Sequence, residues 1–198
     1  HRERLKSAGV LLVGPSNAFI RYIERVLPSL GETGVVMSSL GQLMPGIAAT
    51  AEESAEAAEI KGRLSMADVV ARAVANRQRN FTEPRRLNIE GTWVTLTPKQ
   101  VSRARDRARA TGKPHNEARV TFVKILLREL TDQMTEILEE SAGAGNSTDR
   151  AYLAEDVRSS RDVRVALNLC WMPLTPEKLI SELFSKPGQL EAAAPELT

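Results

Sequence analysis

Arginine is the residue type in this sequence that most clearly suggests a binding chemistry. Arg103, Arg105, Arg107 and Arg109 occupy alternate positions in a stretch with helical periodicity. At this spacing the four guanidinium groups spread around a helix and do not form one stripe. Guanidinium groups neutralise phosphates, so the stretch is a candidate contact for a nucleic-acid backbone. A solvated helix whose arginines pair with acidic neighbours explains the pattern equally well.

Acidic residues form a second group, which follows a Gly- and Ala-rich segment at residues 142–148 that is flexible by composition. They are Asp149, Glu155 and Asp156. A mobile acidic loop could enter a basic channel or approach a bound metal ion. An ordinary charged surface loop is the simpler interpretation, and the residues alone favour it.

The sequence lacks the motifs of the common catalytic sites. Gly14-Pro15-Ser16-Asn17 has neither the glycine spacing nor the lysine of a phosphate-binding loop. His1 and His115 have no partner at the spacing of metal ligands, and Ser16 lacks the flanking glycines of a nucleophile elbow. We therefore expect no catalytic residue, no metal site and no bound cofactor in this chain.

Charge is distributed unevenly along the 198 residues. The net charge is only +2, but residues 72–124 contain 13 basic and 4 acidic side chains, whereas residues 125–198 contain 7 and 13. Such asymmetry suggests faces that meet differently charged surroundings. Cys170 is the single cysteine, which excludes an internal disulfide and favours a reducing, cytoplasmic compartment. No run of about 18 apolar residues occurs, so we expect no membrane span.

Residues 1–47 predict a partial α/β domain. Residues 10–13 form a continuous apolar run that is typical of a parallel strand covered on both faces. Ser16 or Asn17 can cap the helix that follows, and Pro28 and Gly31 are expected to end it. Residues 34–37 predict a second strand and complete one βαβ turn. Two parallel strands need further edge partners, which we expect from outside this chain.

The second domain, residues 48–198, is expected to be mainly α-helical. We predict helices at 65–78, 97–112, 116–141, 162–170 and from 175 onward, with a small β-hairpin at 87–96. The strongest local signal is Thr97-Pro98-Lys99-Gln100, which combines a capping Thr, Pro at the first helical position and Gln for a reciprocal cap. The longest helix carries an apolar seam at Val123, Leu127, Leu130, Met134 and Ile137. Trp171 is expected to be buried at the end of a helix.

Three segments carry a resemblance to a known family. They read VLLVGPSNAFIRYIERVLPSLGE at residues 10–32, KGRLSMADVVARAVANRQR at 61–79 and ALNLCWMPLTPEKLISELF at 166–184. All three resemble the actinobacterial HelD-type ATPases, helicase-like proteins of superfamily 1 that bind RNA polymerase. The resemblance implies that residues 1–47 belong to a P-loop motor lobe whose phosphate-binding loop lies before His1. ATP and magnesium are then expected for the whole protein and not for this segment.

The resemblance also implies roles for individual residues. Pro15, Ser16 and Asn17 resemble helicase motif Ia, which lies beside the nucleic-acid backbone in related helicases. Asn17 matches the Asn of the Thr-Asn element that is common there, whereas Gly14-Pro15 departs from the usual threonines. That departure from the family pattern argues against DNA contact and against unwinding activity.

The helical domain then corresponds to the insertion that forms a wedge in the primary channel of RNA polymerase. There it is expected to open the clamp and to release the polymerase from nucleic acid, with the loop from residue 143 to Asp156 as the candidate channel tip. The alternative function is a nucleic-acid-binding domain of a superfamily 1 DNA helicase, with DNA or RNA as the partner. A purely structural spacer is a third alternative.

Overall fold

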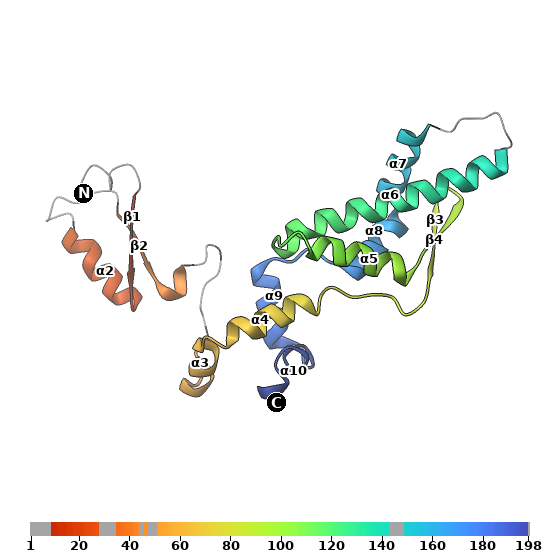
Figure 1. Ribbon diagram of the computed structural model, residues 1–198. Helices are drawn as coiled ribbons and strands as arrows, with labels where there is room; N and C mark the ends of the chain where they lie inside the picture. The colour runs from red at the N-terminus through yellow and green to blue at the C-terminus, as the bar shows by residue number, and fades with distance from the viewer. Residues whose placement is uncertain (1–8, 28–34, 44–45, 47–50, 143–148, 198) are drawn as a thin grey trace. The chain divides into compact units, whose positions relative to one another are not determined.

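The computed structural model describes residues 9–27, 35–43, 46, 51–142 and 149–197 (Figure 1). These residues do not include Pro28 and Gly31, which were expected to end the first helix. They also do not include residues 143–148, which form most of the predicted flexible segment. The fold is mainly α with small β elements, as predicted. The chain divides into two compact units, residues 1–59 and 60–198, so residues 48–59 fall with the first unit and not with the second.

In the first unit, strands β1 (Val10–Gly14) and β2 (Val35–Ser39) pair in parallel, with helix α2 (Asn17–Val26) between them in the sequence. This confirms the predicted βαβ turn. Ser16 caps α2, because its hydroxyl accepts a hydrogen bond from Phe19 N at 3.2 Å. A 3₁₀ turn at Leu40–Gln42 follows β2.

One face of this small sheet is apolar and exposed. Leu11 pairs with Val36, and Leu11, Val13 and Val36 are 57%, 44% and 65% exposed. Alternate residues of a strand point to opposite faces, so these three share the face that α2 does not cover. On the covered face Ile20 of α2 is buried. Within the described residues, the apolar run of β1 is therefore covered on one face and not on the two that the sequence predicts.

The helical unit holds the remaining elements, and helix α3 crosses the division between the units. Their bounds are α3 Ala55–Gly62, α4 Met66–Ala75, β3 Arg85–Ile89, β4 Thr92–Leu96, α5 Pro98–Arg109, α6 His115–Ala142, α7 Arg150–Ser159, α8 Arg161–Cys170, α9 Pro176–Ser185 and α10 Gln189–Ala193. A short 3₁₀ turn at Pro195–Leu197 follows α10. Among the described residues, no helix combines the length and the apolar character that crossing a membrane requires.

Local signals in the sequence set the hairpin and the helix after it. Strands β3 and β4 are antiparallel, and their turn residues Glu90 and Gly91 both have positive φ, 47° and 87°. Two positive φ values are typical of two-residue hairpin turns. At the start of α5, Gln100 N donates to Thr97 Oγ1 (3.3 Å) and Thr97 N donates to Gln100 Oε1 (2.8 Å). The predicted reciprocal cap is thus confirmed.

Helix α6 lies at the centre of the larger hydrophobic core, alongside α5 and the hairpin (Figure 1). Its enclosed side chains are those of Ala118, Phe122, Leu126, Leu130 and Met134. Leu130 and Met134 of the predicted seam are buried, but Val123, Leu127 and Ile137 are only partly buried. Two apolar rows run side by side on α6, and packing against its neighbours turns the row that contains Phe122 and Leu126 inward.

Trp171 ends α8 and is 1% exposed, as predicted for a buried tryptophan at a helix end. Its ring packs between Phe122 and His115, with ring centroids 5.2 Å and 5.4 Å away. Cys170, the residue before it, is also buried.

A smaller core joins α4, α9 and α10, and its buried residues include Met66, Val69, Ala73, Leu179, Leu183 and Ala193. Ser65 holds the N-cap position of α4, but its side chain makes no capping hydrogen bond. Helix α3 has no buried residue.

Candidate functional site

The motif Ia-like residues lie where β1 ends and α2 begins. Pro15, Ser16 and Asn17 are all exposed, at the carboxyl end of a parallel strand, which is the edge where α/β sheets bind ligands. The Ser16 hydroxyl already accepts the capping bond from Phe19 N. Gly14 lies against α2, since a Cβ there would lie 2.6 Å from Phe19 Cδ1 and 2.7 Å from Ile20 Cδ1, and both side chains would have to move.

The four arginines of α5 do spread around the helix, as their spacing predicts, and they have different environments. Arg103 pairs with Glu129 of α6 (Nη2 to Oε1, 2.7 Å). Arg105 is half-buried and donates to Ser102 Oγ at 3.1 Å, and Arg109 Nε donates to Gln78 Oε1 at 2.5 Å. Arg107 is exposed and is the one of the four that lines a groove.

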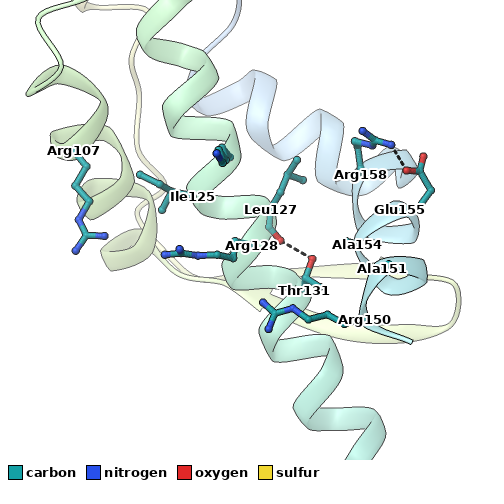
Figure 2. A pocket seen from close by; sticks show the side chains of 11 residues that line it. Arg107, Ile125, Leu127, Arg128, Thr131, Arg150, Ala151, Ala154, Glu155 and Arg158 are labelled. Carbon is teal, nitrogen blue, oxygen red and sulfur yellow. Dashed lines mark hydrogen bonds and ion pairs between the residues drawn. The ribbon is translucent and has the colours of Figure 1, made fainter. Parts of the chain in front are cut away.

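That groove, the basic groove, lies between α6 and α7 and reaches the end of α5. Its volume is about 730 Å³. Five cationic side chains line it, at Arg107, Lys124, Arg128, Arg150 and Arg158. Figure 2 shows that they come from three helices, with Arg107 on α5, Arg128 on α6 and Arg150 and Arg158 on α7.

The floor of the basic groove is apolar. It is formed by Leu127 of α6, which is half-buried against the larger core, and by Ala151 and Ala154 of α7, whereas Ile125 lines the groove on the side of α6 that faces α5 (Figure 2). Thr131 also lines it, but its hydroxyl donates to Leu127 O within α6 at 2.8 Å (Figure 2). The site therefore combines apolar side chains with an excess of cationic ones, and Glu155 is the one acidic residue among those that line it.

Positive charge in the basic groove exceeds its local compensation. Arg150 pairs with Asp132, and Arg158 pairs with Glu155. For the other three cations, Arg107, Lys124 and Arg128, the described part of the chain shows no ion pair with an acidic side chain. An anionic ligand would find three uncompensated cations on one concave surface.

The predicted acidic tip has a different local structure from the one that the sequence suggests. The loop was expected to reach Asp156, but α7 begins at Arg150, so Glu155 and Asp156 lie on a helix. Asp149 is the N-cap of α7 and accepts a hydrogen bond from Ala151 N at 2.9 Å. The difference has a local cause, because Asp is common both in loops and at the N-cap position that begins a helix.

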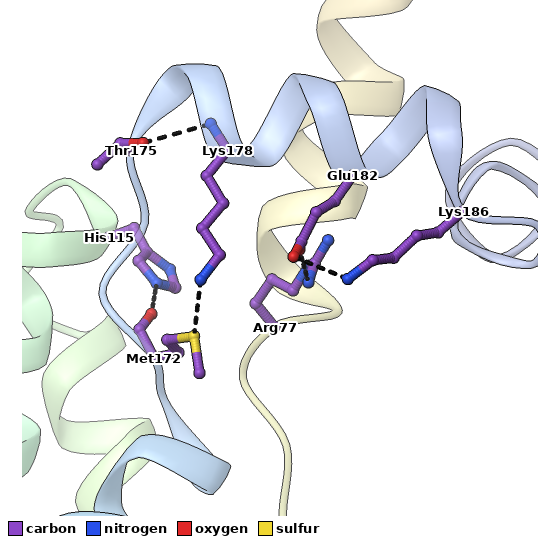
Figure 3. A network of polar contacts seen from close by, with 7 residues as sticks. All are labelled: Arg77, His115, Met172, Thr175, Lys178, Glu182 and Lys186. Atoms are coloured by element: carbon purple, nitrogen blue, oxygen red, sulfur yellow. Dashed lines mark hydrogen bonds and ion pairs between the residues drawn. The ribbon is translucent and has the colours of Figure 1, made fainter.

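A polar network at the start of α6 holds the segment after α8. His115 Nε2 lies 2.9 Å from Met172 O (Figure 3), and His115 Nδ1 lies 3.3 Å from Gln78 Nε2. The first nitrogen then donates and the second accepts, which is the pattern of a neutral ring. Burial lowers the pKa of His115 below its ordinary value, and the charge of Arg119 acts in the same direction.

Neighbouring contacts fasten the same segment by its backbone. Arg119 Nε donates to Trp171 O at 2.6 Å, and Asn116 both donates to Leu174 O (2.7 Å) and accepts from Leu174 N (2.9 Å). His115, Asn116 and Arg119 therefore hold the backbone of the segment after α8 in place.

A second polar cluster lies between α4 and α9. Glu182 accepts from Arg77 Nη1 at 2.7 Å and from Lys186 Nζ at 2.9 Å (Figure 3). The hydrogen bond from Lys186, supported by Arg77, lowers the pKa of the Glu182 carboxyl. This cluster joins the smaller core to the end of α4.

Reactive or metal-binding groups are not gathered elsewhere in the described residues. They contain no group of three or more His, Cys, Asp or Glu side chains placed to hold a metal ion. Burial raises the pKa of the Cys170 thiol to about 11, so it remains a thiol at neutral pH.

Sequence reasoning missed most of the basic groove. Lys124 and Arg128 are one helical turn apart, and Arg150 and Arg158 stand on the next helix, but only the packing of α6 against α7 brings the two pairs together. The repeated same-sign charge at a spacing of four on an otherwise apolar-seamed helix was the signal that could have found it.

Comparisons with known proteins do not extend this description. A scan against protein-family models found no match. A search of curated proteins found no significantly similar sequence.

Proposed function

We propose that this chain is the polymerase-binding part of a helicase-like ATPase, in which the helical unit acts as a wedge in the primary channel of RNA polymerase. In this proposal the wedge opens the clamp and releases the polymerase from nucleic acid. ATP and magnesium are used by the motor lobe to which the β1–α2–β2 unit contributes, and the present chain supplies no catalytic residue.

The observation that carries the proposal is the long, braced helix α6. Its 28 residues span about 42 Å at 1.5 Å per residue. Leu126 and Leu130 are fully enclosed by neighbouring elements. Gln133 ties α6 to the hairpin, since its side chain accepts from Thr95 N and donates to Thr95 O at 3.3 Å. A wedge must resist bending, and a helix braced along its length does so.

The first unit supports the same proposal. A parallel βαβ turn with an exposed apolar face is a piece of a larger α/β layer, because parallel sheets are normally covered on both faces. A motor lobe supplies such a layer.

Binding to purified core RNA polymerase tests the proposal. The 198-residue chain should co-elute with the polymerase in size-exclusion chromatography, and co-elution should persist between 50 and 200 mM salt because a packed protein interface depends little on ionic strength. Absence of co-elution at both salt concentrations would overturn the proposal.

The acidic residues Asp149, Glu155 and Asp156 are proposed to face the polymerase channel, where they would mimic phosphates or approach the catalytic magnesium. The structure indicates conservative replacements: Asp149→Asn keeps the cap of α7, and Glu155→Gln with Asp156→Asn keeps the helix, although Glu155→Gln also removes the ion-pair partner of Arg158. The triple variant of the full-length protein should release stalled polymerase from DNA more slowly. Unchanged release would remove this role from the proposal.

A nucleic-acid-binding domain of a superfamily 1 DNA helicase is the second candidate, and the uncompensated cations of the basic groove favour it. If about four phosphates were neutralised there, affinity for DNA would fall about 100-fold between 50 and 200 mM salt. Such a loss for DNA, together with no binding to polymerase, would favour this second function.

A further inference from the structure

We infer that the basic groove is a docking site for an acidic, amphipathic helical segment of a partner protein. The inference rests on the proposed function only in taking a protein as the partner. It is based on one observation: in a groove between two helices, cationic side chains without an acidic partner among the described residues lie beside apolar side chains.

The charge of the groove defines one property of the occupant. Arg107, Lys124 and Arg128 have no acidic partner among the described residues, and Lys124 and Arg128 are one turn apart on α6, where like charges repel. Carboxylates of a docked segment would relieve this repulsion. Complementary charge of this kind also speeds association and selects partners.

The floor defines the second property. Leu127 presents apolar surface beside the small side chains of Ala151 and Ala154, so room remains for larger side chains from outside. Burying apolar groups there would stabilise the complex in a way that charge pairing alone would not. The occupant therefore needs apolar residues on one face and acidic residues beside them.

The shape of the groove favours a helix. From Lys124 to Thr131 the groove extends about 10 Å along α6, which is about two helical turns. A helix laid between two helices presents apolar residues to the floor at spacings of three and four, and its flanks face the cationic side chains. The acidic flank then lies against Arg107 and Arg128.

A nucleic-acid strand fits these observations less well. Proteins that bind single strands stack bases on aromatic side chains, and none of the residues that line this groove is aromatic. Phosphates would pair with the cationic side chains of the groove but would not contact its apolar side chains favourably. The lining of the groove therefore favours a protein segment over a nucleic-acid strand.

The test uses three fluorescein-labelled probes and the 198-residue chain in anisotropy titrations at 150 mM salt. The first probe is a 16-residue peptide of Leu and Glu with Leu at helical spacing, the second is the same composition in scrambled order, and the third is a 16-nucleotide oligo-dT. The inference predicts that the first probe binds at least about tenfold more tightly than the other two.

Two variants locate the binding. Arg107→Gln with Arg128→Gln should weaken the first probe about tenfold, whereas Lys99→Gln with Arg164→Gln, which removes the same charge from exposed sites outside the groove, should not. Ala151→Leu with Ala154→Leu fills the floor without changing charge and should weaken it as well. The matched control, Ala71→Leu with Ala75→Leu on exposed positions of α4, should have no effect.

The outcomes separate the possibilities. Equal binding of the scrambled peptide, or no effect of the floor variant, would overturn the inference in favour of a simple charged surface. Tighter binding of oligo-dT that is lost with Arg107→Gln and Arg128→Gln would overturn it in favour of nucleic acid. If the peptide fails to bind while polymerase still co-elutes, the groove inference fails alone; if the peptide binds and polymerase does not, the proposed function fails alone.

Discussion

The two units of the chain differ in how far they bury their apolar side chains. In the first unit, Leu11 and Val36 lie side by side on an uncovered sheet face at 57% and 65% exposure. In the helical unit, Leu96, Leu126 and Leu130 are all 0% exposed. Two-stranded sheets are marginally stable by themselves, whereas a helix that buries one side against several neighbours is stabilised by that packing. The difference indicates that packing of apolar side chains contributes far more to the stability of the helical unit than to that of the first unit, as far as the described residues show.

Removal of one core leucine should have the largest effect on this difference. Leu130→Ala should lower the free energy of unfolding of the helical unit by about 2–5 kcal/mol, because a fully enclosed side chain leaves a cavity. The same change at the exposed Leu11 should alter stability by no more than about 0.5 kcal/mol. Hydrogen exchange measured by mass spectrometry reports opening of each unit separately. Comparable losses at both positions would contradict the contrast drawn between the units.

Gly14→Ala should affect the first unit alone. The new Cβ would clash with Phe19 and Ile20, and the repacking should cost about 1–3 kcal/mol. Faster exchange in β1 and α2, with unchanged protection in α6, is the expected result. Gly62→Ala is the matched control, because its Cβ would meet nothing within 4 Å. Slower folding or lower protection in α6 would show that the units are not independent.

Helix caps allow a smaller and symmetrical comparison. Thr97→Ala removes the cap of α5 and should lower the stability of the helical unit by about 1 kcal/mol. Ser16→Ala removes the cap of α2 and should leave the thermal transition of the helical unit unchanged. Thr97→Ser keeps the hydroxyl and serves as the control. A shift of the helical transition by Ser16→Ala would argue for coupling between the units.

The smallest expected effect is a dependence on pH that is confined to the helical unit. Burial lowers the folded-state pKa of His115 below the unfolded value of about 6.5, so the unfolded state binds its proton first as pH falls. The contribution of the neutral ring is present above pH 6.5 and is lost as pH falls from there through the lower folded pKa. Urea unfolding at pH 7.5 and 5 should show this loss in the native chain but a smaller one in His115→Gln. An equal pH dependence in both proteins would exclude His115 as its source.

Elements with strong local signals could be predicted from the sequence. The Thr97 and Gln100 pair set the start of α5, and α6 was predicted at 116–141 and observed at His115–Ala142. A capping box and a long periodic run consist of residues that are close together in the sequence, so both can be recognised without the structure.

Features that depend on packing could not be predicted in the same way. The inward row of α6 contains Phe122 and Leu126 instead of Val123 and Leu127, because contacts with α5 and the hairpin select between two apolar rows. The basic groove depends on α7 lying against α6, and Arg107 alone among its five cations belonged to the predicted arginine set. Asp149 was assigned to a loop because a capping residue and a loop residue look alike without the helix that follows.

The position of Cys170 makes the chain convenient for site-specific labelling. The thiol is buried and its pKa is raised to about 11, so thiol-directed dyes and spin labels should leave it unmodified at neutral pH. A cysteine introduced by Ala154→Cys would then take a single probe on the floor of the basic groove in an otherwise native sequence. Fluorescence or electron paramagnetic resonance at that one site would follow occupancy of the groove directly.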